Sequence, residues 1–105
     1  MRTGAATMEQ TPSEPNGPGI ADRELMGEVR DGDLGRLGEL FERHHHRLFN
    51  FFLKLTRQRT AAEDLVQEVF VRMLKYRHTY RSDADFTPWM FKDVKRIAKN
   101  TAHTA

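Results

Sequence analysis

Residues 60–70 form the stretch TAAEDLVQEVF, and this stretch carries the strongest structural signal in the chain. It opens with a capping-box pattern, in which the Thr60 hydroxyl accepts from the backbone N–H of Glu63 and the Glu63 carboxylate accepts from that of Thr60. Behind this cap, apolar residues recur at helical spacing: Ala62, Leu65, Val66, Val69, Phe70, Met73 and Leu74. The pattern predicts an amphipathic helix over about residues 61–77.

The opposite side of this helix is left to face outward with Asp64, Gln67, Glu68 and Val71. Carboxylates at positions i and i+4 lie on one helix face, where they are suited to receive arginines from a partner. The amide of Gln67, which lies between these carboxylates, further restricts the geometry of a partner that can bind. The alternative interpretation is an ordinary solvated surface, which is the more common role of such a face.

Three further helices are predicted around this one. The four segments cover about residues 21–30, 34–56, 61–77 and 88–100. Asp22 and Asp33 are the expected N-caps of the first two, and Pro88 suits the first turn of the last because its missing N–H costs nothing there. No segment has a strand pattern, so the prediction is an all-α fold, a small four-helix bundle.

The ends of the chain have a different composition from the predicted bundle. Residues 1–19 are rich in proline, glycine and small polar residues, which cannot bury enough apolar surface to offset the entropy of ordering. We therefore predict a disordered tail at 1–19, a helical domain at 20–100 and a frayed C-terminus at 101–105.

Composition excludes several classes of protein. The 105 residues are 38% hydrophobic and 30% charged with a net charge of +2, which suits one small domain and does not by itself indicate a nucleic-acid partner. The absence of cysteine excludes disulfides and thiolate metal sites. No apolar run resembles a signal peptide or a membrane span, so a soluble cytoplasmic protein without a membrane partner is predicted.

The charges are distributed unevenly along the chain. Glu63, Asp64 and Glu68 precede a basic group, and a second basic group lies on one face of the last predicted helix. These groups are Arg72, Lys75, Arg77 and Arg81, and then Lys92, Lys95, Arg96 and Lys99. The acidic pole suits a basic protein surface and the basic pole suits a phosphate backbone; a mixed-charge solvated surface is the plainer alternative.

The run AEDLVQEVF at residues 62–70 and the Phe86-x-x-Trp89 motif resemble region 2 of the bacterial sigma-70 family of transcription factors. The closest group in that family is the extracytoplasmic-function (ECF) type. The Gly32-Asp33 turn and the run LFER at residues 40–43 also look like the family's opening segment. The resemblance covers about residues 22–89.

The resemblance implies two binding surfaces. One is a contact with a coiled coil in the clamp of the largest subunit of RNA polymerase core, through Asp64, Gln67, Glu68 and Val71. The other captures the unwound non-template strand of the promoter −10 element, where flipped bases stack on aromatic rings. Carried onto this chain, the DNA-binding residues are Tyr76, Tyr80, Arg81, Phe86, Lys92, Lys95, Arg96 and Lys99. An anti-sigma factor is a further partner that the resemblance allows, and no cofactor is implied.

The aromatic residues of this second surface also have structural interpretations. Trp89 is more readily a core residue, Phe86 is nearly as well suited to be a hydrophobic staple, and Tyr76 alternatively closes the bundle. Tyr80 lies in the polar segment between helices and is the aromatic residue best suited to contact DNA.

The chain departs from the family pattern in two ways. Asp93 and Arg96 stand where the family has an Arg-Asn pair, and the expected signature recurs four residues later at residues 97–100. Either the last helix carries an extra turn or its register differs. The family's second domain, a helix-turn-helix that binds the −35 element, has no counterpart in these residues, so we expect either a protein with region 2 alone or a truncated piece of a longer one.

The sequence therefore predicts a transcription initiation protein that binds RNA polymerase core and the −10 element. The alternative is a protein-interaction bundle, such as a competitor for the clamp or an anti-sigma partner, without DNA binding. No enzyme is expected, because no nucleophile–base pair, metal set or phosphate loop is present. His44, His45 and His46 point about 100° apart on a helix and so cannot converge on one metal ion.

Overall fold

The computed structural model describes residues 20–104, and the predicted disordered tail at 1–19 lies outside them. Within that range the elements are α1 (Asp22–Arg30), α2 (Arg36–Thr56), α3 (Arg59–Lys75), the 3₁₀ turn η2 (Arg77–Thr79) and α4 (Phe86–Thr104). No strand occurs between residues 20 and 104, which confirms the all-α prediction. None of these helices is both long and apolar enough to cross a membrane.

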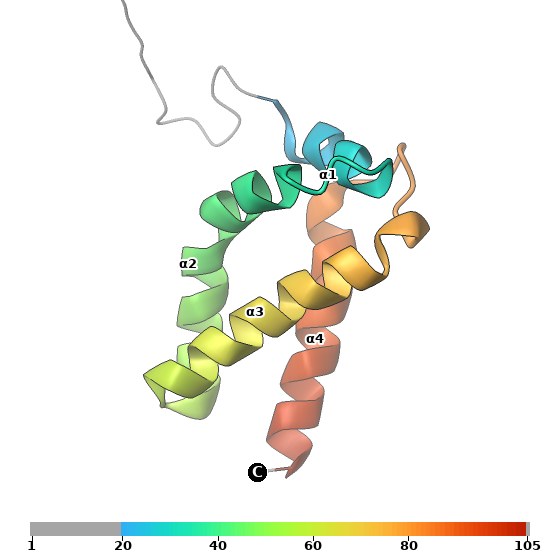
Figure 1. Ribbon diagram of the computed structural model, residues 1–105. Coiled ribbons are helices and arrows are strands. Elements are labelled where there is room, and N and C mark those ends of the chain that lie inside the picture. The colour runs from blue at the N-terminus through green and yellow to red at the C-terminus, as the bar shows by residue number, and fades with distance from the viewer. Residues whose placement is uncertain (1–19, 105) are drawn as a thin grey trace, which may run out of the picture.

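The helices are arranged around the pair α2 and α3, which make the most extensive contact in the fold. A two-residue turn joins them, and its first residue, Arg57, has a left-handed backbone with φ 61°. The backbone N–H of Arg57 donates to the Leu53 carbonyl at 2.7 Å, which ends α2 and reverses the chain. In Figure 1, α3 crosses in front of α4, and α1 lies over the upper end of the bundle.

One hydrophobic core joins all four helices. Its buried members are Leu25, Met26, Val29, Leu40, Leu48, Phe52, Ala62, Val66, Val69, Phe70, Met73, Tyr80, Phe86, Met90, Val94 and Ile97. The apolar stripe predicted for α3 supplies five of these residues. Leu65 and Leu74, at the edges of that stripe, are only partly buried.

The capping box predicted at Thr60 is wrong. Helix α3 begins at Arg59, one residue before Thr60, and its N-cap is Gln58, which makes no side-chain cap hydrogen bond. The backbone N–H of Gln58 instead donates to the Thr56 hydroxyl at 3.2 Å. Because the turn after α2 is so short, the helix starts before Thr60 can take the capping position.

The two expected aspartate caps are also replaced by other residues. Ala21 is the N-cap of α1 and Gly35 that of α2, again without side-chain cap hydrogen bonds. Asp22 serves a tertiary contact instead: its carboxylate lies 2.8 Å from Nε2 of the buried His44 and accepts from Arg43 at 2.9 Å. This cluster ties the start of α1 to α2, so the apparent cap is a link between helices.

The three consecutive histidines have separate environments. His44 is buried beside Asp22, the His45 Nδ1 lies 2.9 Å from the Phe41 carbonyl, and His46 is exposed. Within the part of the chain that the structure describes, no group of three histidine, aspartate or glutamate side chains is placed to hold a metal ion.

Replacement of two glycines by alanine should change the free energy of unfolding in opposite directions. Gly32, in the turn between α1 and α2, has φ +115°, a region that L-residues rarely adopt, so Gly32→Ala should destabilise the fold by about 1–3 kcal/mol. Gly38 lies inside α2 beside open space that an alanine methyl group can occupy, so Gly38→Ala should stabilise the fold by about 0.5–1 kcal/mol. Urea denaturation of both variants measures this difference, and equal effects would contradict the backbone assignment.

Candidate docking and nucleic-acid surfaces

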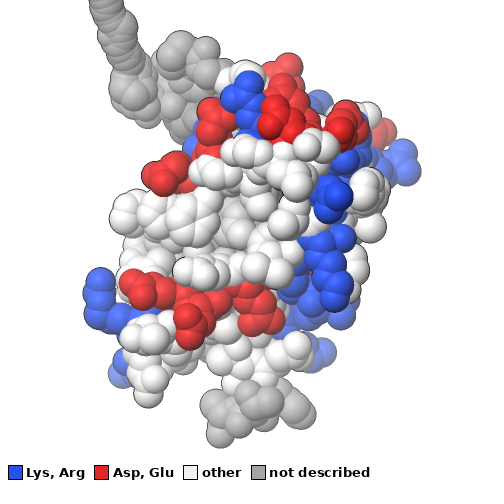
Figure 2. Space-filling model, in the orientation of Figure 1, with Lys and Arg blue, Asp and Glu red and all other residues white. Residues whose placement is uncertain are grey.

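The four outward residues of α3 form one continuous exposed surface, here called the α3 face: Asp64, Gln67, Glu68 and Val71. Val71 is 61% exposed, a high value for a valine. Figure 2 shows a band of acidic side chains across the lower part of this side of the molecule, apart from a second acidic group at its upper end. Such a band next to an exposed apolar residue is suited to a basic protein partner that also buries apolar surface.

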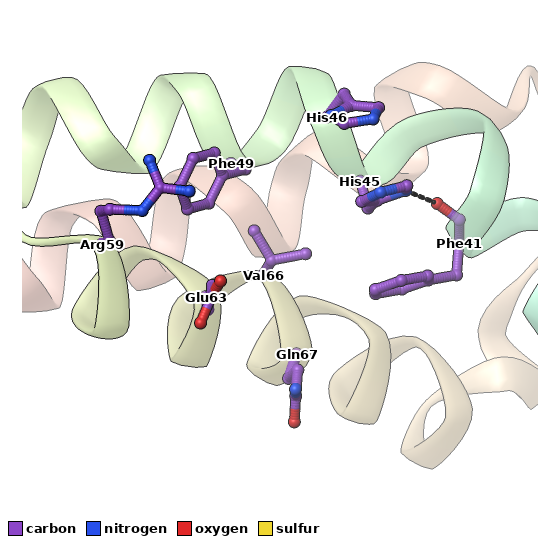
Figure 3. Close-up of a pocket in the computed structure, with 8 residues that line it drawn as sticks. All are labelled: Phe41, His45, His46, Phe49, Arg59, Glu63, Val66 and Gln67. Atoms are coloured by element: carbon purple, nitrogen blue, oxygen red, sulfur yellow. Dashed lines mark hydrogen bonds between the residues drawn. The ribbon is translucent and has the colours of Figure 1, made fainter.

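An open groove of about 480 Å³ lies between α2 and α3 beside the α3 face (Figure 3). Its α2 side carries the stacked rings of Phe41 and His45, whose centroids lie 4.7 Å apart, and the Phe49 ring, with the Arg59 guanidinium 5.3 Å from its centroid. Gln67 lies at the rim and points away from α2. The groove therefore opens directly onto the α3 face.

Sequence reasoning missed this groove. Its signal was the spacing of Phe41, His45 and Phe49 at i, i+4 and i+8, which places aromatic rings in one row along α2. The row becomes a groove wall only when α3 packs alongside it, and the pairing of two helices is not visible in the spacing of one.

The basic residues of the last helix share an exposed side of α4: Lys92, Lys95, Arg96 and Lys99. Helix α4 runs without interruption to Thr104, past the residue 100 at which it was expected to end. The repeated signature at residues 97–100 lies one turn further along the same helix, and its Ile97 is in the core. In Figure 2 a group of basic side chains lies along the right side of the molecule, next to the acidic band.

Two of the expected DNA-contacting rings are buried. Tyr80 is 2% and Phe86 3% exposed, and the Tyr80 hydroxyl donates to the Ala84 carbonyl at 2.7 Å. Burial raises the pKa of the Tyr80 hydroxyl above its ordinary value. The expectation that Tyr80 presents an open ring from a polar loop is therefore wrong, because the segment after η2 folds its ring back against the core. For Phe86, the staple interpretation fits its packing against the His44 ring, with centroids 5.3 Å apart.

Other members of the predicted DNA surface are accessible. Tyr76 is 40% exposed, and Arg81 is exposed and pairs with Asp83 at 3.3 Å. Hydrogen bonding from Arg81 lowers the pKa of the Asp83 carboxyl. Trp89 is partly buried and packs against the core without being one of its buried members, and its Nε1 donates to the Thr79 hydroxyl at 3.3 Å. The structure thus brings Tyr76 to the same side as the basic residues of α4 and removes Tyr80 and Phe86 from the surface.

Comparison with known proteins gives a consistent result. The family model for sigma-70 region 2 matches residues 40–105. The chain is 34% identical over 80 residues to the RNA polymerase sigma factor CarQ of Myxococcus xanthus, covering 76% of this chain and 44% of that protein. It is 27% identical over 79 residues to the RNA polymerase sigma-H factor of Pseudomonas aeruginosa, covering 75% of this chain and 41% of that protein.

A further relative is the ECF RNA polymerase sigma factor SigM of Bacillus subtilis, 30% identical over 64 residues, or 61% of this chain and 36% of that protein. The chain thus spans less than half the length of each of these relatives. No solved structure gives a significant match. The matched residues include all of α3 and α4, which carry both surfaces described above. The chain belongs to the sigma-70 family, and its helical domain is a region 2 of the ECF type.

Proposed function

We propose that this protein acts in transcription initiation by binding RNA polymerase core through the α3 face. The observation that carries this proposal is the exposure of Asp64, Gln67 and Glu68 on a helix whose opposite side is fixed in the core. The two carboxylates are positioned to receive cationic side chains from the clamp coiled coil of the largest subunit. The adjoining groove between α2 and α3 offers apolar surface at the same contact.

We further propose that the basic side of α4, with Tyr76 and Arg81, binds the non-template strand of the promoter −10 element. Lys92, Lys95, Arg96 and Lys99 supply phosphate contacts, which give affinity without sequence information. Opening of the duplex is then driven by the binding of single-stranded DNA rather than by covalent chemistry. Sequence recognition requires contacts to bases, for which Tyr76 is the most exposed aromatic group on this side.

The test is the binding of a labelled single-stranded −10 oligonucleotide to core enzyme, to the chain and to the two together. The proposal predicts that only the mixture binds tightly and with preference for the −10 sequence. Equal binding by core enzyme with and without the chain would contradict it.

The burial of Tyr80 and Phe86 favours a second candidate, a protein-interaction bundle that occupies the clamp without contacting DNA. This candidate predicts that the chain binds core enzyme and adds no affinity for the oligonucleotide. The experiment above therefore separates the two functions directly.

Binding of DNA by the basic side of α4 also predicts how the binding constant depends on salt concentration. Each phosphate contact on a single strand contributes about 0.7 to the slope of log K against log salt, so Lys95→Ala with Lys99→Ala should reduce that slope by about 1.4. The control is Arg47→Ala with Lys54→Ala, which removes the same charge from exposed positions on α2. Equal reductions in both double variants would mean that the effect comes from net charge and not from α4.

A further inference from the structure

The groove between α2 and α3 leaves two aromatic rings of the fold only partly covered. Phe41 and Phe49 both pack against the hydrophobic core, and the Phe41 ring meets the buried Phe70 ring edge-on, with centroids 5.1 Å apart. The outer sides of Phe41 and Phe49 line the open hollow of about 480 Å³. Partly buried rings around a hollow of this size are apolar surface that a protein partner can cover.

The α3 side of the groove carries one cation and one anion, Arg59 and Glu63, which lie one helical turn apart and are both exposed. The ion pairs found between residues 20 and 104 include neither of them. The Arg59 guanidinium instead turns toward the Phe49 ring (Figure 3). An arginine four residues before a glutamate is the less favourable order for pairing within a helix. Both charges are therefore available to a partner.

This pair of opposite charges is complementary to itself under two-fold symmetry. If two copies of α3 lie antiparallel across an axis that passes between Arg59 and Glu63, Arg59 of each copy faces the partner's Glu63. One ion pair then forms on each side of the axis, and the two grooves close against each other. Any other partner must supply a carboxylate and a cation at the same spacing in the reverse order, which a second copy has because of the symmetry.

We propose that this groove is the interface of a symmetric homodimer, in which a second copy of the chain covers Phe41 and Phe49 and pairs Arg59 with the partner's Glu63. This inference goes beyond the proposed function, because the dimer needs neither core enzyme nor DNA. Gln67 lies at the rim of the groove, so the second copy covers an edge of the α3 face. Self-association therefore competes with docking on core enzyme and keeps part of the protein in a form that cannot dock.

Sedimentation velocity of the full chain over a series of concentrations tests the dimer. Because the contact between two helical hairpins is small, we expect a dissociation constant between about 1 μM and 1 mM. The mass should rise with concentration from that of one chain to that of two and no further, since a two-fold contact closes on itself. Higher salt should weaken the dimer, because exposed ion pairs are screened. A monomer at every concentration in this range would overturn the proposal.

Reversal of either charge should break the dimer. Arg59→Glu places carboxylates opposite each other on both sides of the axis, and Glu63→Arg does the same with guanidinium groups. Like charges brought together across an interface repel strongly, so each single variant should raise the dissociation constant at least about 100-fold. The two variants change the net charge in opposite directions, so a loss in both does not come from net charge.

A mixture of the two single variants gives the most specific result. Across the two-fold axis, the new carboxylate of one variant faces the new guanidinium of the other, and the remaining Glu63 faces the remaining Arg59. Two variants that are each monomeric should therefore form a mixed dimer with about the wild-type dissociation constant. The double variant, Arg59→Glu with Glu63→Arg, should dimerise for the same reason. A contact without two-fold symmetry would not be restored in the mixture.

Control variants separate the groove from the rest of the surface. Arg47→Glu and Glu24→Arg reverse charges at exposed positions outside the groove and should keep the wild-type dissociation constant. Circular dichroism checks that every variant is helical. If one single variant is unfolded, the wild-type concentration series and the double variant still decide the question.

The outcomes also separate this inference from the proposed function. A wild-type dimer that is lost in both single variants and restored in their mixture supports the interface. A wild-type dimer that either single variant retains, or that the mixture does not restore, contradicts it and leaves docking on core enzyme untouched. Conversely, failure of the monomer to bind core enzyme would remove the proposed function and not the dimer.

Discussion

Replacement of Gln67 by alanine together with Glu68 by arginine should weaken binding to RNA polymerase core by at least about 100-fold. Removing one partner of a charge pair that becomes buried in an interface costs about 2–5 kcal/mol, and about 2.7 kcal/mol corresponds to 100-fold. The reversed charge adds repulsion to this loss. Both residues are exposed and contribute nothing to the core, so the fold should be unaffected.

The affinity is measured by titrating core enzyme with a fluorescently labelled chain. A matched control is Asn50→Ala with Glu24→Arg, which makes the same kinds of change at exposed positions on α2 and α1. The control should bind as the wild type does. Equal losses in the two double variants would show that net charge, rather than the α3 face, decides the affinity.

Phe52→Ala should destabilise the fold by about 3–5 kcal/mol. Phe52 is fully buried in the core, so its removal takes apolar surface out of the contact among the helices and leaves a cavity. Because small domains have only about 5–15 kcal/mol of stability, this variant should populate unfolded chains under mild conditions.

The neighbouring residue is a natural control for this effect. Phe51 is 44% exposed and its ring packs edge-on against Phe52, with centroids 5.2 Å apart. Phe51→Ala should cost about 1 kcal/mol, mostly the loss of that aromatic contact. Urea denaturation of both variants measures the difference, and a cost for Phe51→Ala as large as that for Phe52→Ala would contradict the packing.

The order and class of the helices were accessible from periodicity alone. The stripe of apolar residues in α3 predicted its buried side, and five of the seven stripe residues are core members. The complementary inference, that Asp64, Gln67 and Glu68 face outward, follows from the same period and holds in the structure. In a regular helix, the residues assigned to the buried side also determine which residues face outward, because the angle between successive side chains is constant.

The ends of the helices were less accessible, because they depend on tertiary structure. Thr60 has the sequence of a cap, but the left-handed Arg57 shortens the turn and α3 begins too early for it. Asp22 also has the sequence of a cap, but it lies within reach of Arg43 and His44, which are about twenty residues away in the chain. A side chain with the sequence of a helix cap does not cap the helix where it can instead make a charged hydrogen bond to a distant residue, because such bonds are stronger than neutral ones.

The exposure of the aromatic residues in the candidate site also depends on tertiary structure. Tyr80 lies among polar residues and so suggests an open loop, yet its ring is buried against Trp89 with centroids 5.2 Å apart. Tyr76 was expected to contact DNA, with closure of the bundle as the alternative, and its ring is exposed beside Arg72. The polarity of neighbouring residues does not determine which side of a short irregular segment faces the core.

Site-specific photo-crosslinking tests the claim that the α3 face is a docking surface for the transcription machinery. A photoreactive side chain placed at Gln67 should crosslink to the largest subunit of RNA polymerase core, and one placed at Glu24 on α1 should not. Absence of a crosslink from Gln67, or equal crosslinking from both positions, would contradict the claim.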